Sequence, residues 1–290
     1  MRITSWNFLH GQPLDPAATA EISEILAEMR SDVLSLQEVD HHLPRSQGKN
    51  QSREVAQHLK TEWWGFAPAI SGTPGVKWRK LARHEQRVIT HVEPELHSKE
   101  NVDLSSDDPS AKNPHVKSLN GVNQYYGISI ISKIPVIQWH RIELGRSLIG
   151  MPLAVGNARG RMPFIYVKDE PRVAMAAILN NGWIVINTHL SFVPLVNLCQ
   201  LFKLARWAKK LEHQYGAQVL LTGDFNLPWG IPSRLLSFKR ATQANSYPSW
   251  KPAISFDYIL TRATNLAKMK EHRHLAVAIS DHRPISVDLL

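Results

Sequence analysis

Five short polar segments of this sequence each lie at the edge of an apolar run, and together they carry the groups that phosphoester hydrolysis needs. They are Ser5-Trp6-Asn7, Leu36-Gln37-Glu38-Val39, Asn187-Thr188-His189-Leu190, Gly223-Asp224-Phe225-Asn226 and Ser280-Asp281-His282-Arg283-Pro284. Hydrolysis of a phosphoester requires a water activated near neutral pH, positive charge on the phosphoryl oxygens and assistance to the leaving oxygen. Carboxylates, amides and imidazoles can supply these functions, so we expect the segments to converge on one site.

The acidic and amide residues divide into two expected roles. Glu38 and Asp281 are expected to bind a metal ion, and Asn7 offers a neutral oxygen to the metal and an amide donor to the substrate phosphate. Asp224 can take a proton from water, and Asn226 can orient that water. Ligands that are all carboxylate or amide oxygens favour Mg²⁺ or Mn²⁺. The sequence contains no cysteine pair or HExxH pattern of the kind that binds zinc.

The basic residues are expected to contact the phosphoryl group. His189 and His282 can each donate a hydrogen bond to a phosphoryl oxygen, and Asp257 can hold His282 in one tautomer and keep it protonated. Arg172 precedes an apolar run and can bind phosphate through its planar guanidinium group. An ordinary salt bridge would explain Arg172 equally well.

Each segment taken alone also has a purely structural interpretation. Gly223-Asp224 is a common turn dipeptide, Glu38 could begin a surface turn, and Asn7 could satisfy backbone groups at a strand end. Most of the fourteen histidines are interpreted as surface or core residues. It is the combination, with each polar group following an apolar run, that favours a functional site.

The apolar runs predict strands, and the longer amphipathic segments predict helices. Strands are expected at 3–8, 33–36, 63–70, 126–132, 135–144, 173–179, 183–187, 218–221, 256–260 and 285–289, and helices after Asp15, at 52–60 and at 195–211. The strands 126–132 and 135–144 are expected to pair, and Asn180-Asn181-Gly182 predicts a tight hairpin turn. Many strands with a few long helices imply two packed sheets with helices outside.

The stretch 71–124 departs from this pattern. It is polar and rich in Lys, Arg, His, Asn and Pro. We expect a basic helix within 76–90 and a surface insertion over 91–121. No internal repeat or Gly/Ser linker divides the chain, so a single domain is expected over 1–290.

The composition is that of an ordinary globular protein with a strong basic balance. The chain has 290 residues, is 43% hydrophobic and carries a formal net charge of +9. This charge favours polyanionic partners, such as nucleic acid or an anionic membrane surface. No apolar run is long enough to span a bilayer, and no signal-peptide stretch is evident. One cysteine, Cys199, excludes an intramolecular disulfide, and we expect a cytoplasmic monomer.

The polar segments, together with Phe256-Asp257-Tyr258, resemble in order the motifs of the endonuclease/exonuclease/phosphatase superfamily, which has the fold of pancreatic deoxyribonuclease. The resemblance implies an α+β fold: a four-layered α/β/β/α sandwich of two mixed sheets packed face to face, with helices outside. It also implies Mg²⁺ dependence, single-step attack by water, and the roles argued above for Asn7, Glu38, Arg172, His189, Asp224, Asn226, Asp257, Asp281 and His282.

Two positions depart from the abasic-site endonucleases of that superfamily. Leu9 stands where those enzymes carry an acid, and His189 stands where they carry a tyrosine. The sequence is therefore more similar to the branch with a histidine, which includes deoxyribonuclease, sphingomyelinase-like and tyrosyl-DNA phosphodiesterase-like enzymes. An acid partner for His189 is expected within 71–90, and Glu85 is the candidate.

The substrate depends on loops and does not follow from the fold. Nucleic acid is the first hypothesis, because five basic residues are interleaved with Trp78 on one predicted rim: Lys77, Arg79, Lys80, Arg83 and Arg87. The alternative is a phosphatase or phosphodiesterase acting on a lipid head group, a sugar phosphate or an inositol phosphate. A catalytically inactive module that binds polyanions is a third hypothesis, and the intact set of acids and histidines argues against it.

Overall fold

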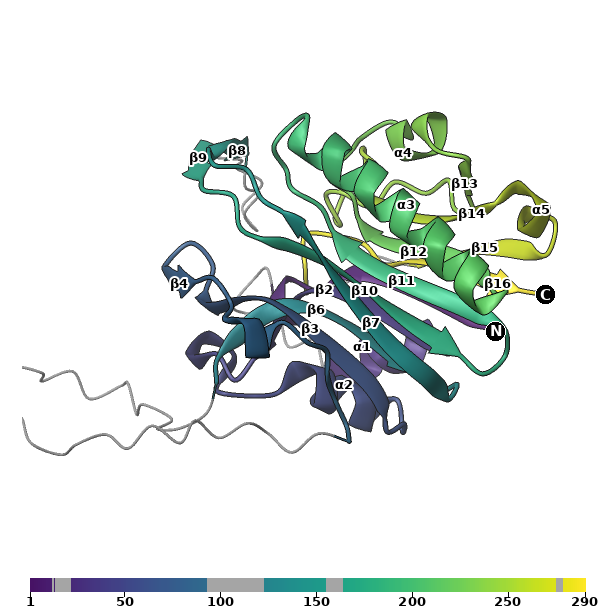
Figure 1. The fold of residues 1–290 in the computed structure, drawn as a ribbon, viewed down its shortest axis with the longest axis horizontal. Helices are drawn as coiled ribbons and strands as arrows, with labels where there is room; N and C mark the ends of the chain where they lie inside the picture. Colours follow the sequence, from purple (N-terminus) through teal and green to yellow (C-terminus); the bar gives the residue numbers. More distant parts are fainter. Residues whose placement is uncertain (12, 14–21, 93–122, 155–163, 275–278) are drawn as a thin grey trace, which may run out of the picture.

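The computed structural model describes residues 1–11, 13, 22–92, 123–154, 164–274 and 279–290. The beginning of the helix expected after Asp15 and nearly all of the insertion expected over 91–121 lie outside these residues. Figure 1 shows two β-sheets packed against each other, with helices on the two outer faces.

The first sheet is eight-stranded and contains both ends of the chain. Its path is β15-β16-β1-β2-β6-β3-β4, and β5 pairs with β3. The strands are β1 (Arg2–Asn7), β2 (Val33–His41), β3 (Trp63–Thr73), β4 (Lys77–Arg79), β5 (Ile89–Thr90), β6 (Tyr125–Ser132), β15 (Met269–Arg273) and β16 (Ile285–Leu289). Strands β1 and β2 are parallel, whereas β1 and β16 are antiparallel.

The second sheet is six-stranded, in the order β13-β14-β12-β11-β10-β7. Its strands are β7 (Val136–Gly145), β10 (Arg172–Leu179), β11 (Trp183–His189), β12 (Gln218–Asp224), β13 (Phe238–Arg240) and β14 (Asp257–Arg262). The predicted hairpin of β10 and β11 is confirmed, and β11 is parallel to β12. Strands β8 (Met151–Ala154) and β9 (Phe164–Val167) form a separate two-stranded sheet.

Three apolar clusters hold the layers together. One lies between the sheets and joins Ile3, Val33 and Ile130 to Met175 and Leu220. The second packs α1 (Ile22–Met29) and α2 (Gln51–His58) on the outer face of the first sheet. The third packs α3 (Val196–Tyr215) on the outer face of the second sheet. The predicted four-layered sandwich is confirmed, because each sheet buries both of its faces.

The remaining helical elements are short. They are α4 (Ile231–Leu235), α5 (Ala263–Leu266) and the 3₁₀ turns η1 (Leu9–Gly11), η2 (Pro44–Ser46) and η3 (Arg83–Glu85). No helix among the described residues is long and apolar enough to cross a lipid bilayer.

Two expectations about individual elements were wrong. Strands β6 and β7 do not pair, because β6 lies between β2 and β3 in the first sheet and β7 pairs with β10 in the second. The four-residue step from Ser132 to Val136 can span about 13 Å, which is enough to cross the roughly 10 Å between packed sheets. The basic helix expected within 76–90 is replaced by β4, η3 and β5.

Candidate active site

The inward-facing positions of several strands change from apolar to polar towards one end. In β1, Ile3 belongs to the core between the sheets, and Asn7 lies four residues later on the same face. The same order of aliphatic, small polar and functional residue recurs in Val185-Asn187-His189 of β11 and Leu220-Thr222-Asp224 of β12. Because side chains alternate with a period of two, each strand delivers its functional group to the same edge of the inter-sheet core.

A buried polar layer joins the two sheets beneath this edge. Gln37 Nε2 donates to Asn187 Oδ1 at 2.7 Å, and Asn187 Nδ2 donates to backbone carbonyls of β2 and β6, both at 2.8 Å. Thr222 Oγ1 donates to Ser35 Oγ at 2.8 Å. This layer was not predicted from the sequence, although small polar residues at inward-facing strand positions were the available signal. The layer fixes the register of one sheet against the other.

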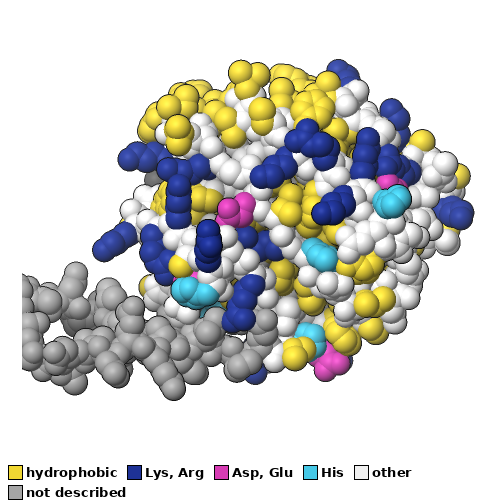
Figure 2. Space-filling view, in the orientation of Figure 1, with side chains coloured by type: hydrophobic (Ala, Val, Ile, Leu, Met, Phe, Trp, Pro, Cys, Tyr) yellow, Lys and Arg dark blue, Asp and Glu magenta, His cyan; other side chains and the backbone are white. Residues whose placement is uncertain are grey.

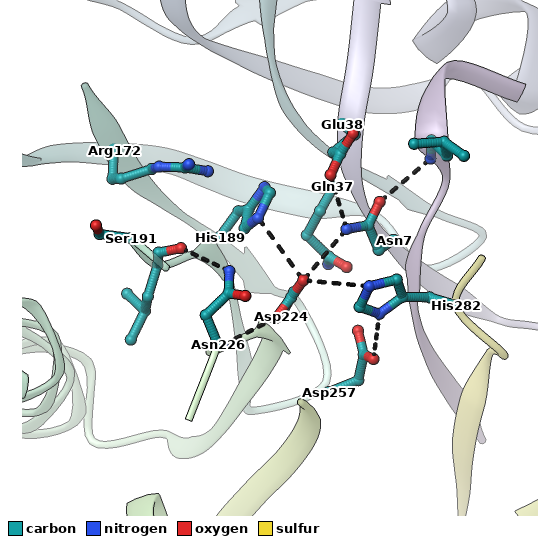
Figure 3. A network of polar contacts seen from close by, with 12 residues as sticks. Asn7, Gln37, Glu38, Arg172, His189, Ser191, Asp224, Asn226, Asp257 and His282 are labelled. Carbon is teal, nitrogen blue, oxygen red and sulfur yellow. Dashed lines mark hydrogen bonds and ion pairs between the residues drawn. The ribbon is translucent and has the colours of Figure 1, made fainter. Parts of the chain in front are cut away.

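Asp224 lies at the centre of the predicted residues (Figure 3). Its Oδ2 atom is 3.2 Å from Asn7 Nδ2, 3.7 Å from His189 Nε2 and 3.8 Å from His282 Nε2. Its Oδ1 atom accepts a hydrogen bond from the Asn226 backbone N–H at 2.9 Å. Burial raises the pKa of Asp224 to about 7, although the charge of His282 acts in the opposite direction. A carboxylate with this pKa can exchange a proton near neutral pH.

The two imidazoles next to Asp224 differ in charge. His282 Nδ1 is 2.7 Å from Oδ2 of Asp257, which is fully buried. Burial disfavours the charged ring, but Asp257 and Asp224 outweigh it and hold the pKa of His282 well above its ordinary value. Burial, followed by the charges of Arg172 and His282, lowers the pKa of His189 well below its ordinary value. At neutral pH the site therefore contains one cationic and one neutral imidazole.

Glu38 reaches the site because the backbone departs from regular β-structure. The pairing of β2 with β6 shifts register between Leu36 and Val39, and Glu38 has a φ of 55°. Asn226 and Ser280, also at or beside the site, have φ values of 48° and 72°. Residues other than glycine with positive φ are strained, and such strain concentrates at functional sites.

Glu38 and Asp281 form an acidic edge of the site. Burial raises the pKa of Glu38, the hydrogen bond from Asn7 lowers it, and the charge of Asp281 raises it further. Among the described residues, Asp281 receives no side-chain hydrogen bond, and both carboxylates line the same cavity. Two carboxylates that repel each other while open to a cavity are suitable hard oxygen ligands for a divalent cation.

Both polar atoms of the Asn7 side chain, which was expected to contact the metal, have protein partners in this structure. Its Oδ1 atom accepts a hydrogen bond from the Leu9 backbone N–H at 3.2 Å, while its Nδ2 atom donates to Glu38 at 3.0 Å and to Asp224. Asn7 thus presents donors to the acids and orients them. Ligand atoms of Asp224, Asp257 and His282 also lie within 4.8 Å of one another. A metal bound there would have to replace the 2.7 Å bond between Asp257 and His282, so Glu38 and Asp281 are the better candidates.

Arg172 forms a salt bridge and also lines the cavity. Its Nη2 atom is 3.4 Å from Oδ1 of Asp169, and its buried side chain lines the cavity. Figure 3 shows the guanidinium group directed towards His189. The ion pair therefore positions a fixed positive charge at the site.

Glu85 is not the partner of His189. Its carboxylate forms two hydrogen bonds with Arg79, at 2.6 and 2.7 Å, and accepts others from the Ala82 N–H and the Tyr125 hydroxyl. The carboxylate that lies near His189 is that of Asp224, whose Oδ2 atom is 3.7 Å from Nε2 of the ring.

The site opens into a cavity of about 500 Å³. Besides the predicted residues, the lining includes several that the sequence analysis did not identify as functional: Tyr126, Glu170, Phe192, Tyr247 and Phe256. The expected basic rim does not line this cavity. Its five Lys and Arg residues are exposed, and within the described part of 71–124 the cavity is lined by Pro74.

Comparison with known proteins supports the family resemblance inferred from the sequence motifs. The model of the endonuclease/exonuclease/phosphatase family matches residues 4–282. No curated protein sequence matches the chain.

Several solved structures share the fold at low sequence identity. A 3′ phosphatase from Neisseria, bound to a product DNA hairpin, is 16% identical with a TM-score of 0.53 and covers 100% of this chain and 99% of its own. The human Nocturnin catalytic domain with bound sulfate is 15% identical with a TM-score of 0.52, covering 99% and 92%. A mannosyl-6-phosphatase from Bacteroides thetaiotaomicron is 9% identical with a TM-score of 0.53, covering 100% and 99%. This chain therefore belongs to the endonuclease/exonuclease/phosphatase family and is a hydrolase of phosphoester bonds.

Proposed function

We propose that this hydrolase uses Mg²⁺ or Mn²⁺ to cleave phosphoester bonds in nucleic acid by in-line attack of water. The observation that carries the mechanism is the position of Asp224, whose Oδ2 atom lies within 3.2 to 3.8 Å of nitrogens from Asn7, His189 and His282. Asp224 would take the proton of the attacking water, and the hydrogen bond from the Asn226 N–H would keep its carboxylate oriented.

Glu38 and Asp281 are the residues that would hold the cation. When bound, it would supply Lewis-acid stabilisation of the phosphoryl oxygens. Asn7 holds Glu38 in place through a 3.0 Å hydrogen bond from its Nδ2 atom. The same amide group also donates to Asp224 Oδ2. The donor set of carboxylates favours a hard cation over zinc.

Three side chains, two of them cationic, would stabilise the charge that develops on the phosphoryl group. His282, charged through its contact with Asp257, would donate to one phosphoryl oxygen. His189 would donate to a second oxygen as a neutral ring, and Arg172 would provide permanent charge. Donors fixed in a buried site need little reorganisation during the reaction, which is the main source of such stabilisation.

Charge and pocket composition support nucleic acid as the substrate. The net charge is +9, and Figure 2 shows Lys and Arg predominating over Asp and Glu on the face drawn there. Phe192, Tyr247 and Phe256 line the cavity, and aromatic rings can stack on nucleobases. The Neisseria relative was solved with a DNA product. Monomeric state, cytoplasmic location and a single domain stay predictions.

A specific observation favours a second candidate, hydrolysis of a small phosphate ester. The cavity of about 500 Å³ lies within the range of small-molecule pockets, roughly 300 to 1,000 Å³. One structurally similar protein is a mannosyl-6-phosphatase. A sugar phosphate or inositol phosphate would fit a pocket of this size.

An activity screen separates these candidates. The purified protein is incubated with single-stranded DNA, plasmid, RNA, sugar phosphates, inositol phosphates and phospholipids, with Mg²⁺ or Mn²⁺ or with EDTA. We expect cleavage of nucleic acid that requires the cation, declines as salt rises and is lost in Asp224→Asn. Phosphate release from small esters alone would favour the second candidate. Hydrolysis of no phosphoester under any of these conditions would contradict both.

A further inference from the structure

Glu170 is a buried acid at the site that the proposed mechanism does not use. Its side chain lines the cavity, and the residue is only 7% exposed. No hydrogen bond from the described residues reaches its carboxylate. The neighbouring Asp169 differs, because its carboxylate accepts hydrogen bonds from the Ser147 N–H at 2.6 Å and the Ser191 hydroxyl at 2.8 Å and contacts Arg172. Asp169 is thus satisfied by the protein, whereas Glu170 is open to a ligand.

Tyr126 presents a second unused polar group to the same cavity. Its ring packs with Leu43 and Ile70, and its hydroxyl has no hydrogen bond among the described residues. Burial, together with the charges of Glu38 and Glu170, raises the pKa of Tyr126 well above its ordinary value. The hydroxyl therefore remains protonated and can donate a hydrogen bond. It lies close enough to Glu170 for the charge of that carboxylate to affect its pKa.

A buried carboxylate without donors is unfavourable unless a ligand supplies them. Burial raises the pKa of Glu170 to about 7, while Arg172 acts in the opposite direction. A second phosphate on the substrate would be repelled by Glu170, and an ammonium group would be repelled by Arg172. A neutral hydroxyl can donate to Glu170 and accept from Tyr126, so it is the group that suits both.

We propose that Glu170 and Tyr126 form a subsite for a hydroxyl group on the alcohol portion of the substrate, close to the scissile phosphoester. The substrate class is then an ester of a hydroxylated alcohol, such as a ribonucleotide, sugar or other polyol. This inference rests on the proposed function, because it requires the phosphoester to lie at Asp224. If the substrate is nucleic acid, the hydroxyl subsite predicts a preference for ribose over deoxyribose.

The test uses matched substrates with and without a hydroxyl group. One pair is a ribo- and a deoxyribo-oligonucleotide of the same sequence, which differ by the 2′-hydroxyl of each nucleotide, and the other is a sugar phosphate and its deoxy analogue. We expect the wild-type protein to prefer the hydroxylated member by roughly 10- to 100-fold in kcat/KM, as a hydrogen bond to a charged group supports. Glu170→Gln and Tyr126→Phe should each reduce this preference by about tenfold.

Two controls separate recognition from general damage. Glu143→Gln changes an exposed acid on β7 and should keep both the wild-type preference and the wild-type kcat/KM. Thermal unfolding verifies that Glu170→Gln is folded, and Tyr126→Phe, which keeps the packed ring, tests the subsite independently. An equal loss on both members of a pair would show that Glu170 only positions Arg172, and it would overturn the proposal.

Binding provides a readout that does not need turnover. Calorimetry with Asp224→Asn compares the affinity of the two members of each pair, with and without Glu170→Gln. Equal affinity for both members overturns the subsite even when hydrolysis occurs. Conversely, a hydroxyl preference in binding that Glu170→Gln removes supports the subsite, and failure of the wild-type protein to hydrolyse either member would count against the proposed function alone.

Discussion

The contact between Asp257 and His282 gives a quantitative test of the site. Asp257→Asn keeps the shape of the side chain and an oxygen that can accept from His282 Nδ1, now 2.7 Å away. It removes a negative charge from a fully buried position. Because Asp257 is a main reason that the pKa of His282 is high, the substitution should lower that pKa and leave His282 a weaker donor.

The magnitude follows from the type of hydrogen bond that is lost. Bonds to charged groups contribute about 1.5 to 3 kcal/mol. Since about 1.4 kcal/mol corresponds to a factor of ten in rate, kcat/KM should fall by roughly 10- to 150-fold. The direct Coulomb attraction is larger, but burying both groups offsets part of it.

The assay is a comparison of kcat/KM for the wild-type protein, Asp257→Asn, His282→Gln and the double variant. Because Asp257 acts through His282, adding Asp257→Asn to His282→Gln should cause little further loss. Asp288→Asn is the control, because its hydrogen bond with Arg2 is also 2.7 Å, but both side chains are partly exposed and neither lines the cavity. Wild-type activity in Asp257→Asn, or fully additive losses in the double variant, would refute the reasoning.

Three further predictions concern the metal site, the polar layer and the core. Glu38→Gln should weaken Mn²⁺ binding measured by calorimetry by about tenfold or more, and unchanged affinity would remove Glu38 from the metal site. Asn187→Ala should lower the free energy of unfolding in a denaturant titration by about 2 to 4 kcal/mol, because it leaves buried partners without hydrogen bonds, whereas Asn181→Ala in the exposed turn should change it little. Burial and the charge of His42 lower the pKa of His41 to about 3, so between pH 6.5 and 3 the unfolded chain binds a proton that the folded protein does not. Stability should therefore fall on acidification, by about 2 kcal/mol from this residue at pH 5, and His41→Phe should reduce that slope; an unchanged slope would contradict the shift.

Local signals predicted some elements well. The β10–β11 hairpin was predicted because the Asn-Gly pair specifies its turn within a few residues. The order of strand, helix and strand from β1 to β2 was also predicted from periodicity, and the structure shows that the two strands are parallel. The predicted pairing of β6 with β7 was wrong, because nothing between Ser132 and Val136 indicates whether the chain turns within one sheet or crosses to the other.

The chemical groups of the site were present in the sequence as strand-end motifs. Since side chains alternate along a strand, the positions of Asn7, His189 and Asp224 relative to the core followed from the run of apolar residues before each of them. The choice among phosphoester substrates did not follow from the sequence, because the cavity wall is assembled from strand ends and loops, such as those that carry Tyr126 and Glu170.

The sequence by itself determined which functional groups each strand carries and on which face, because both are properties of a few consecutive residues. Only the tertiary structure decided which groups meet. The bulge in β2 that turns Glu38 to the cavity and the hydrogen bonds from Asn7 to Glu38 and Asp224 depend on packing between parts of the chain that lie far apart in the sequence. Such contacts are set by how two sheets bury their common core, and no short stretch of sequence contains that information.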